Sequence, residues 1–206
     1  MRFTLRFTTP RVTLALAALL PALAGFSVRA PIDMQPESRL WIAGSSTVRS
    51  FQCQAGSFET KLESAGNAAV DAVLAGDKAI TSVVVTVPVE KLDCKNGTMN
   101  EHMRKALKAA QHPAVTFRVD GYDLAKSSDG VAGVAVTLNG TLTMGGVEKP
   151  ITVSAQAKPG ENGTLVVSGT REVRMTEFGL KPPTLMLGTM KVDERVKVGF
   201  ELILKD

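Results

Sequence analysis

The sequence predicts an all-β domain in which eight strands curl into a barrel, with one α-helix between the third and fourth strands. The main observation is that apolar and polar residues alternate with a period of two in one segment after another, which is typical of half-buried strands. Only one segment clearly follows the helical period. Gly140, a glycine in the middle of a strand, marks a place where a sheet bends as it curls. Together these observations favour a β-barrel with a single helix.

Eight segments show the strand pattern. In the third, Val83, Val85 and Val87 share one face, and in the fourth Val115 and Phe117 do so. We expect such apolar rows to face the interior, because successive side chains on a strand point to opposite sides. In chain order, the predicted strands are residues 39–48, 51–62, 82–89, 114–124, 134–144, 151–157, 165–176 and 196–204.

The hairpin after the fifth strand has two candidate turns, Asn139–Gly140 and Gly145–Gly146. Leu138 keeps phase with Leu142, so the strand continues through the first pair. The second pair supplies the positive dihedral angles that a hairpin turn needs. The sequence therefore predicts an extended Gly140 and a turn at Gly145–Gly146, within a loop of about four to six residues that includes 147–150.

Residues 98–111, TMNEHMRKALKAAQ, form the one clear helical pattern. Thr98 or Asn100 can cap its first turn, and Pro113 follows its end. The apolar side of this helix either packs on the barrel or forms one wall of a ligand site. Residues 65–80 are compatible with a short helix or a loop.

The N-terminal segment has the features of a secretory signal peptide, because three arginines precede the apolar run Val12–Phe26 and no acidic residue occurs before Asp33. Cleavage is expected after Ala24, since Pro31 would obstruct a cut after Ala30. The alternative is a membrane anchor, but the run is shorter than the ~18 apolar residues of a span. We therefore expect a signal peptide at 1–24, a flexible mature N-terminus at 25–38 and one barrel domain at 39–206, exported to the periplasm.

The charge of the mature chain argues against a nucleic-acid partner. The formal net charge drops from +4 to +1 when the leader, with its three arginines and no acidic residue, is removed. A nucleic-acid surface normally shows a strong excess of Lys and Arg. No later stretch is long enough for a membrane span, and the oligomeric state is left open.

The two cysteines, Cys53 and Cys94, both lie in the exported part, where an oxidising compartment would let them form a disulfide. Closing a loop of roughly 40 residues would stabilise the fold by ~4 kcal/mol in the chain-entropy model. Two separate buried thiols are the alternative. Metal binding is not supported, since His102 and His112 do not complete a ligand spacing with these cysteines.

The usual sequence signatures of catalysis are missing. The chain has no nucleophile elbow, no zinc-protease motif and no phosphate-binding loop before a helix. Arg171 and Arg174 are interpreted as part of a solvated face rather than as an anion clamp. We therefore expect no enzyme activity, no cofactor and no metal site.

Three stretches resemble the YceI-like family of exported polyisoprenoid-binding proteins: HMRKALKAAQHPAVTFR at 102–118, GTLTMGGVEKPITV at 140–153, and the tail from Met175 to Leu204. The resemblance covers about residues 40–204. It implies a lipocalin-like form, an extended eight-stranded antiparallel barrel whose lumen holds a long isoprenoid chain. The first hairpin departs from the family pattern, since it lacks the usual histidine and carries Cys53 instead.

A lumen of this kind would contact its ligand through apolar side chains. Eight strands enclose an interior that is either filled or wide enough for one slim ligand. The methionine-rich segment 175–190 would then serve either as an adaptable lid or as a plug. The expected ligand-binding residues are Met103, Leu107, Phe117, Val136, Leu138, Leu142, Val153, Phe178, Leu185, Met186, Met190 and Phe200.

Three classes of function remain open at this point. The first is a carrier or store for an isoprenoid, polyprenyl or quinone-like, or for another long apolar lipid. The second is a stress-related exported interaction module with a filled barrel and a protein partner. The third is an enzyme that acts on a bound quinone or prenyl group. An apolar tunnel would favour the first class, a packed interior the second, and a perturbed ionisable group beside a tunnel the third.

Overall fold

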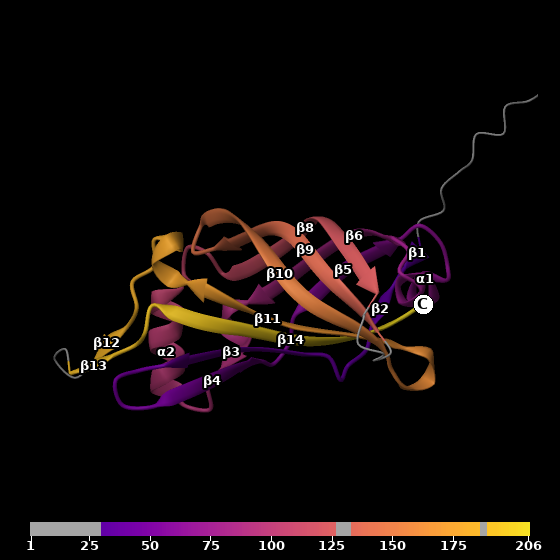
Figure 1. Ribbon diagram of the computed structural model, residues 1–206. Coiled ribbons are helices and arrows are strands. Elements are labelled where there is room, and N and C mark those ends of the chain that lie inside the picture. Colours follow the sequence, from indigo (N-terminus) through magenta and orange to yellow (C-terminus); the bar gives the residue numbers. More distant parts are fainter. Residues whose placement is uncertain (1–29, 127–132, 186–188) are drawn as a thin grey trace, which may run out of the picture.

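The computed structural model describes residues 30–126, 133–185 and 189–206. Most of this part of the chain forms one antiparallel sheet that curls around an elongated interior (Figure 1). The predicted all-β fold, with a helix between the third and fourth predicted strands, is confirmed. The expected signal peptide lies outside the described residues.

Nine long strands build the sheet, and short strands extend its edges. The long strands are β3 (Arg39–Ser45), β4 (Ser50–Ala55), β5 (Glu59–Ser64), β6 (Ile80–Pro88), β8 (Ala114–Lys126), β9 (Val134–Met144), β10 (Val147–Pro159), β11 (Leu165–Arg174) and β14 (Arg195–Lys205). The short ones are β1 (Ala30–Pro31), β2 (Asp33–Met34) and β7 (Leu92–Asp93), while β12 (Thr184–Leu185) and β13 (Met190–Lys191) form a separate hairpin. Single 3₁₀ turns are η1 (Val89–Lys91), η2 (Glu161–Gly163) and η3 (Met175–Phe178).

The strands follow the order β1-β5-β6-β8-β9-β10-β11-β14-β3-β4-β7. Strands β4 and β5 are consecutive in the chain but lie near opposite edges, and no pairing joins them in the described residues. The prediction of one continuous strand at 51–62 is therefore wrong, because the chain leaves the sheet at 56–58 and re-enters it at the other edge. The sheet is a curled half-barrel that is open on the side of β4 and β5.

The hairpin between β9 and β10 turns at Gly145–Gly146, where φ is +57° and +82°. Met144 pairs directly with Val147. The predicted turn is confirmed, but the loop has two residues instead of four to six, since residues 147–150 already belong to β10. Positive φ at both central positions is the geometry that matches the natural twist of a hairpin.

Gly140 is extended and lies within β9, as the sequence predicted. A Cβ at this position would meet the aromatic ring of Phe117 and the backbone carbonyl of Arg118. The missing side chain therefore lets the ring of Phe117 lie over the strand where the sheet bends. This close approach is one of the uses of a glycine inside a strand.

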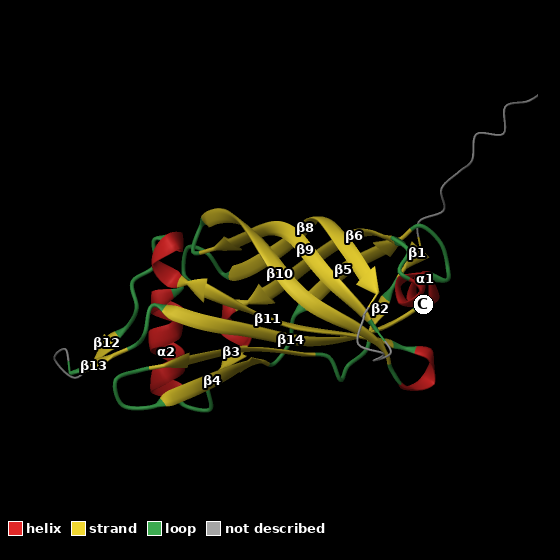
Figure 2. Ribbon diagram, viewed as in Figure 1, coloured by secondary structure: helices red, strands yellow, loops and turns green. Residues whose placement is uncertain are grey.

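Helix α2 (Gly97–Ala106) lies across one end of the curled sheet, and α1 (Ala69–Ala75) lies at the other (Figure 2). The side chain of Asn96 caps α2 and accepts a hydrogen bond from the Met99 amide at 2.9 Å. The predicted cap, two or four residues later, is wrong. The helix also ends earlier than predicted, with Leu107 as its C-cap.

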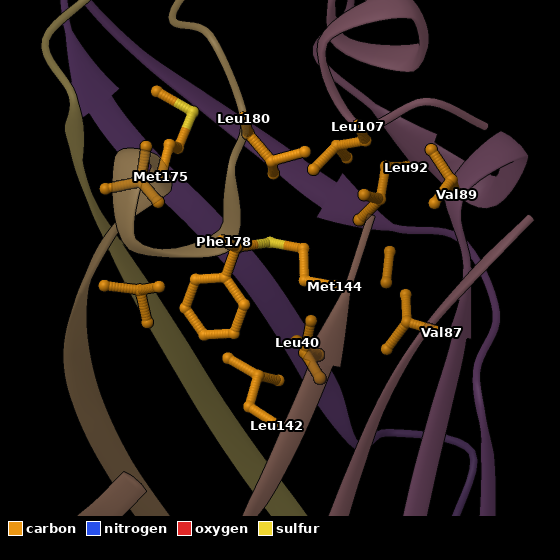
Figure 3. Close-up of a cluster of buried hydrophobic side chains, with 13 residues drawn as sticks. Leu40, Val87, Val89, Leu92, Leu107, Leu142, Met144, Met175, Phe178 and Leu180 are labelled. Carbon is orange, nitrogen blue, oxygen red and sulfur yellow. The ribbon is translucent and has the colours of Figure 1, made fainter. Parts of the chain in front are cut away.

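Two hydrophobic clusters pack inside the sheet, one toward each end. The cluster near α2 contains Phe178 and Leu180 of the η3 region, which point toward Leu142 and Met144 of β9 and Leu107 of the α2 C-cap (Figure 3). The cluster near α1 includes the buried face of that helix. Both clusters use the apolar rows that the period-two pattern directs inward.

The chain segment just before β3 is part of the packed structure from residue 30 onward, although 25–38 was expected to be flexible. Ala30 pairs with Ser64 of β5, and Met34 pairs with Leu204 of β14. Between them, the side chain of Ile32 is only 7% exposed. Burial of Ile32 in the core helps to hold residues 30–34 against the sheet.

Candidate ligand-binding site

The inner face of the curled sheet encloses a cavity of about 570 Å³ next to α2. Inward rows on β6 and β8, for example, contribute Val85, Val87, Val115 and Phe117 to its wall. Residues of α2 and Met190 of the β12–β13 hairpin border it at the end of the barrel. This volume lies within the roughly 300–1,000 Å³ of sites that hold small molecules.

A second cavity of about 170 Å³ continues the first toward α1. Apart from Tyr122 and Arg171, all its lining side chains are apolar. The Tyr122 hydroxyl already accepts a hydrogen bond from the Ile80 amide at 2.9 Å. The two cavities adjoin inside the curled sheet, because several residues line both, and together they are called the lumen here. These shared residues are Leu40, Val85, Phe117, Leu142, Val173 and Val198.

Most of the residues expected to contact a ligand lie on the wall of this lumen. The larger cavity is lined by Met103, Leu107, Phe117, Leu142 and Met190. The smaller one is lined by Phe117, Val136, Leu138, Leu142, Val153 and Phe200.

The segment 175–190 is divided between core and cavity wall. Phe178 is only 1% exposed and lines neither cavity, because it belongs to the core cluster near α2 (Figure 3). Met175 and Met190 line the larger cavity. Met186 and the side chain of Leu185 lie outside what the structure describes. The part around Phe178 is therefore packed core, whereas Met175, Pro183 and Met190 of the same segment reach the larger cavity.

The structure adds lumen residues that were not singled out from the sequence. Val173 and Val198 line both cavities, while Ile42 and Phe51 line the larger one. The alternation on each predicted strand could have found them, since they keep phase with buried neighbours. It could not show which inward residues border empty volume and which are covered by others.

The prediction that Arg171 and Arg174 share one solvated face is confirmed only in part, since both are exposed but on different sides of β11. Arg174 points outward and forms an ion pair with Glu194 at 3.3 Å. Arg171 pairs across the sheet with Val198 and lines the smaller cavity. A spacing of three residues places strand side chains on opposite faces, so the sequence already carried this signal.

Most of the polar residues that line the two cavities lie at the α2 end. Ser46, Arg49, Asn96, Thr98 and His102 line the larger cavity there. The disulfide predicted from the sequence also lies in this wall. Cys53 of β4 is bonded to Cys94, which precedes α2, with an S–S distance of 2.01 Å, so the prediction is confirmed. The bond ties the start of the helix to the sheet.

A hydrogen-bonded group around Asp93 fixes the same chain segment. The Asn100 side chain donates to Asp93 Oδ1 at 2.9 Å and accepts from the Cys94 amide at 2.8 Å. The Lys95 amide also donates to Asp93, at 2.9 Å. These bonds, that from Asn100 foremost, lower the pKa of Asp93 from 3.8 to about 2, because they favour the ionised carboxylate.

Neither a metal centre nor a spanning helix emerges from the part of the chain that the structure describes. Within residues 30–126, 133–185 and 189–206, no three His, Cys, Asp or Glu side chains come together as metal ligands. Among the same residues, no helix is both long and apolar enough to cross a membrane.

A family model for the YceI-like domain matches residues 38–204, which is most of the chain. The chain belongs to the YceI-like family. The match begins just before β3 and ends in β14, so the family covers both cavities and α2. No curated protein sequence matches the chain.

Several solved structures have the same fold at low sequence identity. BcnA of Burkholderia cenocepacia is 18% identical, with a TM-score of 0.63 over 83% of this chain and 99% of its own. A polyisoprenoid binding domain from Saccharophagus degradans, implicated in plant cell wall breakdown, is 14% identical, with a TM-score of 0.61 over 85% and 97%. A YceI protein of Campylobacter jejuni is 18% identical, with a TM-score of 0.51 over 71% and 80%. These likenesses confirm the lipocalin-like fold.

Proposed function

We propose that this YceI-like protein binds one long isoprenoid or similar apolar chain in its lumen, as an exported carrier or store that does no chemistry on its ligand. The observation that carries the proposal is the continuous apolar wall shared by the two cavities. A filled barrel, as in the alternative of a protein-interaction module, would leave no such volume.

The apolar wall can account for tight binding by itself. Each methylene-sized unit that leaves water gains ~0.8 kcal/mol, so a chain of many units binds without a dense set of polar contacts. A long lumen suits such a ligand better than a compact one. From Val136 to Met144, the lumen-lining part of β9 extends over about 26 Å at the usual rise of a strand.

The export part of the proposal is supported by two features. The Cys53–Cys94 disulfide fits an oxidising compartment such as the periplasm. The N-terminal sequence has the charged, apolar and small-residue regions of a signal peptide. An exported protein with an apolar lumen can shield a water-insoluble chain while it is stored or moved. The fold shared with a solved polyisoprenoid binding domain agrees with a ligand of this class.

The direct test is to block the lumen with one large side chain. Leu142 lines both cavities, so Leu142→Trp should abolish uptake of a fluorescent geranylgeranyl probe by delipidated mature protein. Thr137→Trp is the matched control, because this exposed residue of β9 points away from the lumen. We expect the control to bind the probe like the parent.

Circular dichroism and thermal melting should show that both variants keep the sheet. Equal uptake by Leu142→Trp and the parent would contradict binding inside the lumen. If the delipidated parent took up no probe at all, the interaction-module alternative would replace the proposal.

A further inference from the structure

Among the described residues, Arg171 is the one charged residue on the wall of the smaller cavity. It lies in the inward row of β11 between Gly169 and Val173, and its cross-strand partner is Val198. Yet the residue is exposed, so its charged end reaches water while its stem borders the lumen. The wall of the lumen must therefore open close to this residue.

β10 and β11 separate next to Arg171, and farther along the η3 region packs against β10. These strands pair only where residues 155–159 of β10 face 165–169 of β11. Residues 170–174 of β11 remain paired with β14 on their other side but have no partner on β10. β10 arches away from β11 over this stretch (Figure 1). Arg171 thus borders a lateral gap that begins where the pairing ends.

A second cation comes from the strand on the other side of the gap. Lys149 pairs with Leu142 of β9 and lies two residues from Ile151, which lines the smaller cavity. It therefore belongs to the lumen-facing row of β10, although it is exposed. Each strand that borders the gap contributes one positive charge on its inner face.

Most arginine side chains in the described residues have a partner, but that of Arg171 does not. In the described residues, Arg39, Arg118, Arg174 and Arg195 form ion pairs, and Arg104 donates to the Glu90 carbonyl. In that part of the chain, the side chains of Arg49 and Arg171 show no ion pair and no hydrogen bond. These two are also the arginines that line the cavities. A guanidinium with all its donors free, beside an apolar cavity, is suited to a phosphate or carboxylate.

We propose that the apolar ligand carries an acidic head group, and that this group binds Arg171, assisted by Lys149, at the lateral gap between β10 and β11. The inference rests on the proposed function, since the apolar chain must occupy the lumen. Arg171 then determines which amphiphiles the protein selects, because a neutral prenyl alcohol would leave the guanidinium without an anionic partner.

Arg49 is the competing location for such a head group. It lies at the β3–β4 turn, where Ser46, Asn96, Thr98 and His102 add polar atoms to the rim of the larger cavity. Water can hydrogen-bond to these polar groups, so they do not require a ligand head group. Arg171 has fewer polar neighbours, because Tyr122 is the one other polar residue among the described residues that line the smaller cavity. This difference favours Arg171.

The test compares three unlabelled competitors that displace a fluorescent geranylgeraniol from the mature protein: geranylgeranyl diphosphate, geranylgeraniol and inorganic diphosphate. The parent should bind the prenyl diphosphate roughly tenfold more tightly than the alcohol, as expected for a hydrogen-bonded charge pair. Arg171→Gln should remove most of this preference, and Lys149→Gln should reduce it less. Lys197→Gln, which removes one positive charge from the outer face of β14, is the control and should keep the preference.

The outcomes separate this inference from the proposed function. A parent that binds geranylgeraniol without preferring the diphosphate would contradict only the acidic head group. A preference that persists in Arg171→Gln but is lost in Arg49→Gln would move the head group to the α2 end and overturn the assignment. Equal binding of inorganic diphosphate and prenyl diphosphate would indicate a free-anion site instead. No binding of either prenyl compound would contradict both proposals. Melting temperatures near that of the parent would show that the variants are folded.

Discussion

The two ends of the lumen differ in the helix that covers them. At one end, α1 buries Ala69, Val70 and Val73 in the core. At the other, none of the residues of α2 is buried, and the helix is held by its flanks, through the Cys94 disulfide and the buried Leu107. The cavity is about 170 Å³ toward α1 and about 570 Å³ beside α2.

This difference shows that strand alternation alone does not decide whether a barrel is filled. The same inward rows of valine and leucine run through both ends. A helix that inserts its apolar face completes the packing, whereas a helix that rests over the rim leaves volume behind. The α2 end, which has the larger cavity, is called the mouth of the lumen, and the more fully packed α1 end is called its floor. Three predictions test this contrast.

The largest loss of stability is expected when valine replaces a turn glycine, and its size should differ between the two ends of the lumen. Gly145 and Gly163 both have positive φ, which disfavours valine by about 1–3 kcal/mol at either site. A Cβ at Gly145 would also meet the buried side chain of Leu180, but at Gly163 it would meet nothing within 4 Å. Gly145→Val should thus lower the free energy of unfolding by about 3–5 kcal/mol, overpacking included, and Gly163→Val by clearly less.

Urea unfolding of both variants and the parent measures this difference. Equal losses would mean that the η3 region does not pack tightly on the β9–β10 turn. The assignment of Leu180 and Phe178 to the core, rather than to a movable lid, would then be wrong.

The next effect concerns large-to-small changes at the two ends. Leu165, toward the α1 end, is 2% exposed, so Leu165→Ala should cost about 2–5 kcal/mol of unfolding free energy. Met190 borders the larger cavity and is only partly buried, so Met190→Ala should cost less than about 1 kcal/mol, because fewer packing contacts are lost. Thermal and urea unfolding check both values. Similar costs would contradict the contrast between a packed floor and an open mouth.

The smallest effect is a pH dependence at the start of α2. The pKa of Asp93 is lowered from 3.8 to about 2 by its bonds from Asn100 and Lys95, so its ionised form stabilises the folded state. This stabilisation is complete above about pH 4 and is lost as the pH falls toward 2. The melting temperature of Asp93→Asn should therefore lie below that of the parent at pH 7, and the gap should close between pH 4 and 2. A gap that stays constant for Asp93→Asn over this pH range would contradict the assignment.

The sequence predicted the architecture because period-two alternation is a local signal that each strand carries by itself. The α2 position, the extended Gly140 and the Cys53–Cys94 bond were also predictable. The break between strands at 56–58 was not predictable, because the alternation of apolar and polar residues hardly changes there. Only the strand order shows that the chain passes from one edge of the sheet to the other. The cap at Asn96 was missed because Asn96–Gly97 also has the form of a turn.

The candidate site was predictable only in part, for a similar reason. Inward positions such as Leu138 and Leu142 follow from phase along a strand, but empty volume depends on what several elements leave uncovered. Phe178 shows this limit. The composition of its segment fits either a lid or a plug, and only the contacts in the structure show that Phe178 belongs to the packed core. The role of Arg171 likewise depends on the divergence of β10 from β11, which no local pattern encodes.

The most direct measurement of the central claim is native mass spectrometry of the mature protein purified from its own host, followed by organic extraction of what it carries. We expect one apolar chain per protein, released on unfolding and identified as a prenyl-type lipid in the extract. The Leu142→Trp variant, purified in the same way, should carry none. A parent protein that is ligand-free under these conditions, and that stays so when prenyl lipid is added, would contradict the claim that the lumen is a binding site.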